Sequence, residues 1–167
     1  DPVTEAMVQI DSIGHYGSAN ERGIDMSHTA TSGNGDAAPG SAFLRKDAKF
    51  VIIYISDEDD YSSTDPAAME KHIKSLKPTN NMVSVHAVAG DVPHGCTGNG
   101  GAADGARFYD LVTRMNGTFL SICATDWGTP MEQLAHETMS LSYFYLSGDA
   151  IEDTITVKID GSISKDW

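Results

Sequence analysis

Apolar residues along the chain fall into two patterns, which predict strands and helices in alternation. Three segments rich in β-branched and aromatic residues predict strands, namely KFVIIYIS (49–56), MVSVHAVA (82–89) and TFLSIC (118–123). The first of these is almost continuously apolar, which is typical of a strand buried on both faces. Two later segments, SYFYLS (142–147) and TITVKID (154–160), are also expected to be extended.

Helical spacing of apolar residues separates these strands. Met69, Ile73 and Leu76 mark a helix that begins after Thr64 or Asp65, with Pro66 in its first turn. A second helix contains Phe108, Leu111, Val112 and Met115, and Asn116-Gly117 is expected to end it. The remaining expected helices are a short one over 3–12, one starting near Glu21 with Asn20 as its cap, and one whose capping box is formed by Thr129, Pro130 and Glu132.

The order strand, helix, strand, helix, strand predicts an α/β fold. Crossover connections of this kind give a mainly parallel sheet with helices on its faces, so we expect a three-layer, doubly wound, Rossmann-like architecture. We expect residues 1–147 to form one α/β domain and residues 148–167 a β extension or the start of a following β module.

The charge balance limits the classes of partner. The chain has 24 acidic and 11 basic residues, a formal net charge of -13, which disfavours nucleic acid and anionic membranes. No run approaches the roughly 18 apolar residues of a membrane span, and no signal peptide is visible. Because the chain opens at Asp1-Pro2, we expect a processed product or a fragment.

The two cysteines, Cys96 and Cys123, are not spaced as zinc ligands. One interpretation is a disulfide, which would stabilise the fold by about 3–4 kcal/mol and implies an oxidising compartment. The other is a pair of unrelated thiols in a cytosolic protein. We favour the disulfide, because Cys96 lies in a Gly-rich loop that a covalent link would fix.

Four consecutive carboxylates, Asp57 to Asp60, follow the first predicted strand directly. Ligands of parallel sheets bind beyond the carboxyl ends of strands, and Mg²⁺ or Ca²⁺ would relieve the repulsion between the acidic side chains. Hydroxyls of Ser18, Ser56 or Thr64 could complete the shell of such a cation. The alternative is an ordinary solvated acidic turn.

Segment 42–63 (AFLRKDAKFVIIYISDEDDYSS) resembles a strand region of bacterial von Willebrand factor type A (vWA) domains, and GSANERGI (17–24) resembles a loop of their metal site. The resemblance covers roughly residues 14–147 and implies a metal-ion-dependent adhesion site. It implies that Asp57 is the strand-end metal ligand and Ser18 the loop hydroxyl. Glu58, Asp59 and Asp60 match no fixed role in that family, and any of them could bind a water of the shell or a second cation.

The chain departs from the vWA pattern, because it has no Asp-x-Ser-x-Ser motif and no strand run before residue 49. It resembles the C-terminal half of such a domain. We therefore expect the edge of strand 49–56 to be covered by a missing N-terminal segment of the same domain or by another chain. The alternative is an unrecognised strand around Met7–Ile10.

These observations predict an extracytoplasmic module for metal-ion-dependent adhesion or protein binding, and not an enzyme. A protein ligand would contact Asp60 and Tyr61 beside the metal. The six histidines lack zinc-hydrolase spacing. The alternatives are a metal-dependent hydrolase, in which carboxylates and a cation activate water, and a purely structural domain of a surface assembly.

Overall fold

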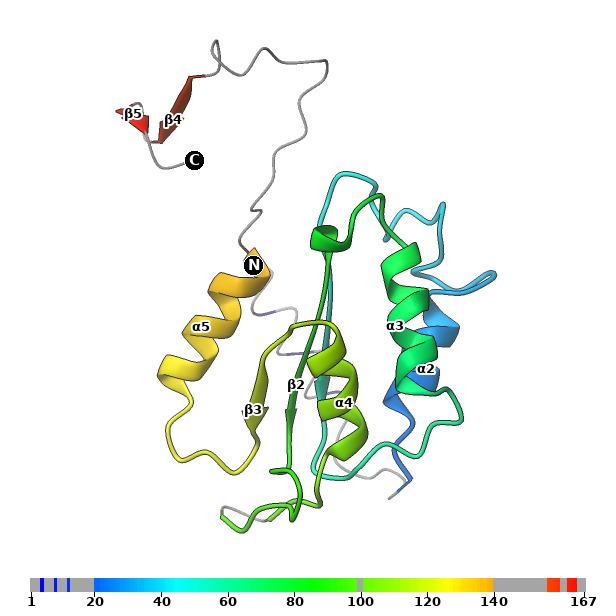
Figure 1. Cartoon of the computed structure of the whole chain (residues 1–167), viewed down its shortest axis with the longest axis vertical. Coiled ribbons are helices and arrows are strands. Elements are labelled where there is room, and N and C mark those ends of the chain that lie inside the picture. Colours follow the sequence, from blue (N-terminus) through cyan, green and yellow to red (C-terminus); the bar gives the residue numbers. More distant parts are fainter. Residues whose placement is uncertain are drawn as a thin grey trace.

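The computed structural model describes residues 20–98 and 101–139, and outside them Thr4, Val8, Ser12 and the short stretches 156–159 and 162–164. Three strands form a parallel sheet in the order β1 (Phe50–Ile55), β2 (Val83–Ala89) and β3 (Phe119–Ser121). The helices whose full extent lies in the described residues are α2 (Gly23–Ala30), α3 (Pro66–Ser75), α4 (Ala106–Arg114), α5 (Gly128–Met139) and a short 3₁₀ helix, η1 (Asn80–Met82) (Figure 1). The predicted α/β fold with a parallel sheet is confirmed.

The sheet follows the crossover rule of parallel strands. α3 connects β1 to β2 and α4 connects β2 to β3, so both helices lie on the same face of the sheet. α2 packs on this face as well, while α5 lies on the opposite side, as Figure 1 shows. The described elements thus have the layering helix, sheet, helix, which is compatible with a Rossmann-like arrangement.

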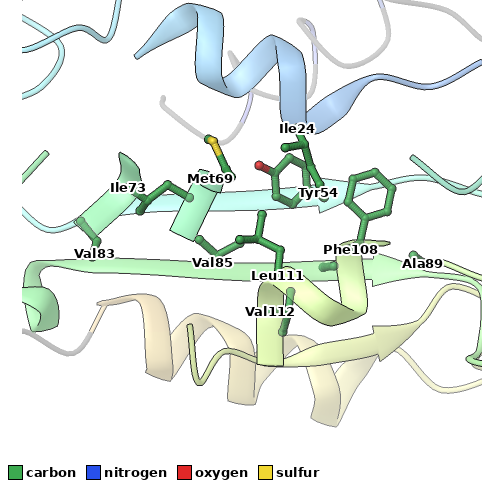
Figure 2. Packing of buried hydrophobic residues seen from close by; sticks show 11 residues of the cluster. Ile24, Tyr54, Met69, Ile73, Val83, Val85, Ala89, Phe108, Leu111 and Val112 are labelled. Atoms are coloured by element: carbon green, nitrogen blue, oxygen red, sulfur yellow. The ribbon is translucent and has the colours of Figure 1, made fainter. Parts of the chain in front are cut away.

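The main core lies between the sheet and the helices α2, α3 and α4. Each strand gives alternate residues to it, such as Tyr54 from β1 and Val85 from β2, because side chains of a strand alternate between its two faces. Phe108 stacks on Tyr54 at a ring-centroid distance of 4.9 Å (Figure 2). The helices complete the core with Ile24, Met69, Ile73, Leu111 and Val112.

The opposite face of β1 differs from the prediction. Strand 49–56 was expected to be buried on both faces, yet Ile53 is 43% exposed and Ile55 is 68% exposed. The equivalent face of β2 is covered, since His86 is 3% and Val88 is 1% exposed. Among the described residues, β1 pairs only with β2, so it forms one edge of the described sheet.

Two helix starts also differ from the sequence-based expectation. Asn20 does not begin the helix; α2 starts at Gly23, and the carboxylate of Asp60 accepts the backbone N–H of Ile24 instead. α5 starts at Gly128, whose N–H is bound by Asp126, and not at the predicted capping box of Thr129. By contrast, Asp65 caps α3 as predicted, accepting the N–H of Ala67 at 2.8 Å.

Segments near the two ends are described only in part. Thr4, Val8 and Ser12 are helical, which agrees with the expected helix over 3–12. Because Val8 is helical, it does not belong to the alternative strand expected around 7–10. In the predicted extension, β4 (Val157–Ile159) and β5 (Ser162–Ser164) pair in antiparallel orientation. The predicted strand 142–147 lies outside the described residues. Within the described residues, no helix has the length and apolar content that crossing a membrane requires.

Candidate functional site

The candidate site is the segment that follows β1, which we call the acidic turn (residues 56–61). Ser56 N–H still bonds to the carbonyl of Val88 at 3.1 Å, so the chain leaves the sheet immediately after this residue. The Ser56 hydroxyl then donates to the carbonyl of Glu58 and accepts the Glu58 N–H. This hydroxyl is therefore used within the turn itself.

Asp60 is the structural centre of this region. Its side chain is fully buried and accepts hydrogen bonds from the N–H of Ile24, from the N–H and hydroxyl of Ser62, and from the guanidinium of Arg107. The Arg107 Nε lies 3.2 Å from an Asp60 carboxylate oxygen. A buried carboxylate needs a positive partner and hydrogen-bond donors, and Asp60 has both. Asp60 was predicted to contact a partner protein, but its side chain has no exposed surface for such a contact.

Asp59 and Arg107 join the turn to α4. The Asp59 carboxylate accepts the backbone N–H of Arg107 at 3.1 Å, in the first turn of the helix. The guanidinium of Arg107 also donates to the carbonyls of Ser62 and Thr64 at 3.0 and 2.7 Å. A carboxylate at a helix N-terminus is favourable because unpaired N–H groups point toward it. Asp59 therefore holds α4 in place.

Asp25 of α2 completes the connection from the helix side. Its carboxylate accepts the N–H groups of Ser63 and Thr64 at 3.0 and 2.9 Å and forms an ion pair with Arg22 at 2.6 Å. Hydrogen bonds from the Thr64 side chain and from the Ser63 and Thr64 backbone hold the pKa of Asp25 well below its ordinary value. Asp25 therefore stays ionised and fixes the chain that follows the acidic turn.

The remaining side chains of the turn differ from Asp59 and Asp60 in exposure. Asp57 is exposed, and within the described part of the chain only its carbonyl forms a hydrogen bond, as the acceptor of the Ala103 N–H at 2.8 Å. Glu58 is half-buried, and the ring of Tyr61 is 60% exposed. The side chains of Asp57 and Tyr61, and in part that of Glu58, can thus reach a ligand. The backbone of the turn that presents them is fixed at both sides.

The residues of the expected metal site do not come together in the described part of the chain. No group of three His, Cys, Asp or Glu side chains suited to a metal ion occurs among the described residues. Asp59 and Asp60 already accept hydrogen bonds from Arg107, and Ser18 lies outside the described residues. Asp57 is the side chain best placed to ligate Mg²⁺ or Ca²⁺, and alone it does not make a cation shell.

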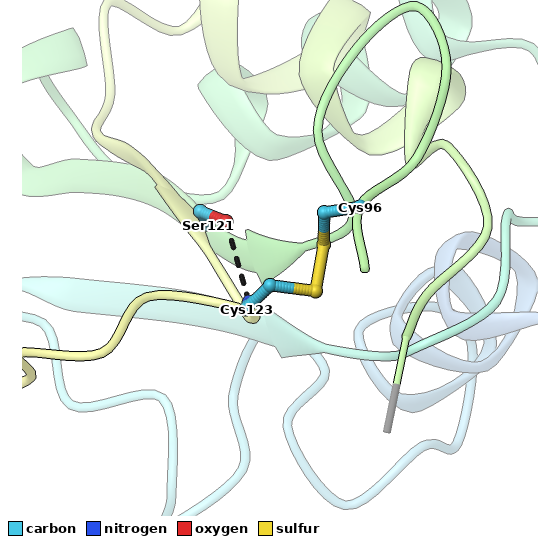
Figure 3. The surroundings of a disulfide bond; sticks show 3 residues. All are labelled: Cys96, Ser121 and Cys123. Atoms are coloured by element: carbon cyan, nitrogen blue, oxygen red, sulfur yellow. Dashed lines mark hydrogen bonds between the residues drawn. A yellow bond between two sulfur atoms is a disulfide. The ribbon is translucent and has the colours of Figure 1, made fainter. Parts of the chain in front are cut away.

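A disulfide joins the two loops beside the acidic turn. Cys96, in the loop after β2, is bonded to Cys123, in the turn after β3, with a Cα–Cα distance of 6.1 Å (Figure 3). The Cys123 N–H donates to the Ser121 hydroxyl at 3.3 Å. The predicted pairing is therefore present, and it links the carboxyl ends of two neighbouring strands.

A second polar cluster lies under α5, on the other face of the sheet. His86 Nδ1 accepts the N–H of Thr118 at 3.1 Å, so its proton resides on Nε2 when the ring is neutral. Glu137 of α5 accepts a hydrogen bond from the Thr118 hydroxyl, and its carboxylate lies 3.9 Å from His86. The Lys49 ammonium donates to the Glu137 carbonyl at 2.7 Å. The cluster attaches α5 to the sheet through one helical turn.

Acid is expected to destabilise the fold through His86. Burial, aided by Lys49 and opposed by Glu137, lowers the pKa of His86, so the folded chain favours the neutral ring. A group whose pKa is lower in the folded state contributes stability above its unfolded pKa, near 6.5, and loses it as the pH falls. We expect the free energy of unfolding to fall by up to about 1.4 kcal/mol per pH unit below pH 6.5 through this residue.

Urea unfolding of the wild type and of His86→Gln between pH 7.5 and 5 measures this slope. The variant should show a flatter dependence than the wild type. His72 adds a slope of the same sign in both proteins, since burial, and then the charge of His28, lower its pKa. An identical slope in wild type and His86→Gln would contradict the assignment.

No pattern in the sequence indicates that Arg107 is the partner of Asp60. The two residues are 47 positions apart, and nothing in the local pattern around Arg107 distinguishes it from a solvated arginine. The pairing of Asp25 with residues 63 and 64 was also missed, for the same reason. Only the acidic run itself indicates that one of its carboxylates has a cationic partner. Four adjacent carboxylates repel one another, and a nearby cation reduces that repulsion.

Comparisons with protein-family models, with curated proteins and with solved structures find no significant match to this chain. The resemblance to vWA domains therefore stays a prediction from the sequence.

Proposed function

We propose that this chain is an extracytoplasmic protein-binding module of the vWA type, whose partner contacts the edge and exposed face of β1 together with the acidic turn. The observation on which this rests is the exposure of Ile53 and Ile55 on an edge strand, next to exposed Asp57 and Tyr61. Apolar groups beside charged and aromatic ones are the composition expected of a protein interface.

The edge of β1 supports this proposal on energetic grounds. A long apolar edge presents unpaired N–H and C=O groups and invites pairing with another strand. Proteins that keep such an edge free of partners usually place charged residues or proline along it, and the sequence FVIIYI of β1 contains neither. A protein segment that adds to β1 would cover Ile53 and Ile55 and would bond to the backbone groups that no described residue pairs with.

The acidic turn supports it on geometric grounds. Its backbone is fixed by the bonds of Asp59 and Asp60 to α4 and α2, so Asp57 and Tyr61 stand on a rigid base. A partner would not need to order this loop on binding, which lowers the entropic cost of association. Basic groups of the partner would be attracted by a chain of net charge -13.

In this proposal a divalent cation is an optional ligand of Asp57, and protein binding does not depend on it. Mg²⁺ or Ca²⁺ at Asp57 would need further ligands from outside the described residues, such as Ser18, from the partner, or from water. A metal-dependent hydrolase needs a denser set of ligands, and the described residues do not bring three together. We therefore place binding before hydrolysis. The disulfide fits an oxidising, extracytoplasmic compartment.

Site-specific photo-crosslinking tests the proposed function. A photoactivatable residue in place of Ile55 should form a discrete crosslinked product with another protein in the native cell fraction. Introducing Ile53→Lys in the same chain should remove that product, because a charge on the exposed face of the edge opposes pairing. The same photoactivatable residue in place of the exposed Thr29 of α2 serves as the control position.

Two outcomes would overturn the proposal. One is a crosslinked product from position 55 whose yield does not fall when Ile53→Lys is introduced. The other is the absence of any crosslinked product specific to position 55. Repeating the reaction with EDTA, and then with added Mg²⁺ or Ca²⁺, decides the role of the cation. Loss with EDTA that Asp57→Ala reproduces is the result expected of a metal-ion-dependent contact.

A further inference from the structure

Basic side chains gather at the amino end of β1, although the chain as a whole is strongly acidic. Two adjoining cavities of about 790 and 420 Å³ lie there and share Ala42, Leu44, Arg45 and Lys77 in their walls. Their walls also contain Lys46 and Lys49. We call this region the basic groove, defined by Arg45, Lys46, Lys49 and Lys77.

The four cations of the basic groove form no close ion pair with a described residue, although the carboxylate of Asp47 lines the first cavity beside them. Arg22, Lys74, Arg107 and Arg114 each lie within 4.0 Å of a carboxylate, whereas no groove cation forms such an ion pair with a described residue. Lys49 and Lys77 donate to backbone carbonyls, of Glu137 and Arg45, which are dipoles without a net charge. The walls of the two cavities contain four cations and one carboxylate, that of Asp47, so the groove keeps an excess of positive charge that can receive an anionic group.

The electrostatic state of the buried groove lysine points the same way. Lys77 is 7% exposed, and its burial lowers the pKa of its ammonium, with Asp47 opposing and Arg45 reinforcing the effect. A cation that has lost its hydration gains more from a nearby anion than an exposed cation does. Burial lowers the pKa of Lys49 as well, against the opposing charge of Glu137.

The walls of the groove favour a ligand that is apolar as well as acidic. Phe43 is 67% exposed at the second cavity and meets Phe50 edge to face at a centroid distance of 6.4 Å. Leu44 and Leu76 line the first cavity. A small inorganic anion would leave these apolar walls uncovered, whereas an acidic peptide segment with large side chains would cover them.

We infer that the basic groove receives the acidic turn of a second copy of this chain. The turn exposes the required chemistry, with the carboxylate of Asp57 between the apolar Ile55 and the aromatic Tyr61. This inference rests on the proposed function, since it names the partner of the acidic turn. The shape of the turn is already fixed by Asp59 and Asp60, so it can enter the groove without rearrangement.

The positions of groove and turn determine the geometry of the assembly. Lys49 precedes β1 and Asp57 follows it, so the two surfaces lie at opposite ends of a six-residue strand, about 20 Å apart. Two copies that each place their acidic turn in the other's groove form a closed two-fold dimer, whereas a one-way contact is heterologous and grows head to tail unless it closes into a ring. The net charge of -13 opposes this growth only weakly at physiological salt, where screening acts over about 8 Å.

Sedimentation of charge-reversed variants in 150 mM salt tests the inference. The wild type should form concentration-dependent oligomers. Arg45→Glu/Lys46→Glu, with an acidic groove, and Asp57→Lys/Glu58→Lys, with a basic turn, should each weaken self-association by at least about tenfold. A mixture of the two variants should associate again, because each surface of one is then complementary to the opposite surface of the other.

Recovery in the mixture is the decisive observation, since a change in net charge alone would not produce it. Lys71→Glu/Arg114→Glu gives the same change in net charge as the groove variant and should associate as the wild type does. A monomeric wild type at millimolar concentration, or a groove variant that associates like the wild type, would overturn the inference. Crosslinking from position 55 to a different protein would still support the proposed function in that case, so the two can fail separately.

Discussion

Arg107→Met is expected to lower the free energy of unfolding by about 3–5 kcal/mol, the usual cost of leaving a buried charge without its partner. The carboxylate of Asp60 is fully buried, and the Arg107 guanidinium lies 3.2 Å from it. Methionine retains most of the side-chain volume, so the loss reports the charge and hydrogen bonds of Arg107 more than its packing. Urea unfolding at pH 7, followed by circular dichroism, measures the change.

A matched arginine on the same helix provides the control for this prediction. Arg114 of α4 pairs with Asp110 and Glu70 on the surface, and exposed pairs of this kind contribute about 1 kcal/mol or less. Arg114→Met should therefore change stability little. The double variant Asp60→Asn/Arg107→Met should recover part of the loss, because it removes the uncompensated charge. A loss below about 1 kcal/mol for Arg107→Met would show that Asp60 is not a buried, ionised partner of that residue.

Removal of the disulfide should have the second large effect. Cys96→Ser/Cys123→Ser opens a loop closed over a sequence separation of 27, which is expected to cost about 3.5 kcal/mol in the chain-entropy description. The loops after β2 and β3 should then lose their protection from hydrogen exchange before the core of the sheet does. Thermal unfolding and amide exchange detected by mass spectrometry together measure both effects.

The reductant comparison separates the bond from the substitution. Dithiothreitol should destabilise the wild type by nearly the same amount as the double substitution and should leave the substituted chain unaffected. Mass spectrometry of protein isolated without reductant should show a loss of two hydrogens relative to the reduced chain. Two free thiols in that protein would contradict the disulfide and the oxidising compartment inferred from it.

Much of the sheet could be predicted because its signals are local. The apolar segment around β1 and the helical spacing of Met69 and Ile73 are visible in windows of ten residues, and both elements are present. The burial of β1 could not be predicted in the same way. A continuous apolar strand is expected to be covered on both faces, but whether a layer reaches Ile53 and Ile55 depends on where helices of distant sequence lie.

The candidate site shows the same division between local and distant information. Its position after a parallel strand followed from the order of elements, and Asp57 is exposed there. Which of the four carboxylates is buried and which is exposed depends on contacts with residues that are distant in the sequence. Asp60 meets Arg107 and the N-terminus of α2, which turns the most acidic-looking segment of the chain into a structural junction at two of its four positions.

The hydrogen bonds that join the acidic turn to two helices have a consequence for the rate of binding. Asp60 accepts the Ile24 N–H of α2, and Asp59 accepts the Arg107 N–H of α4, so moving the turn requires breaking bonds at the beginnings of both helices. A surface held in this manner meets its ligand already in shape, and encounter is limited by diffusion and orientation, not by a slow rearrangement of the loop. Differences in affinity between complexes would then arise almost wholly from how fast the partner leaves.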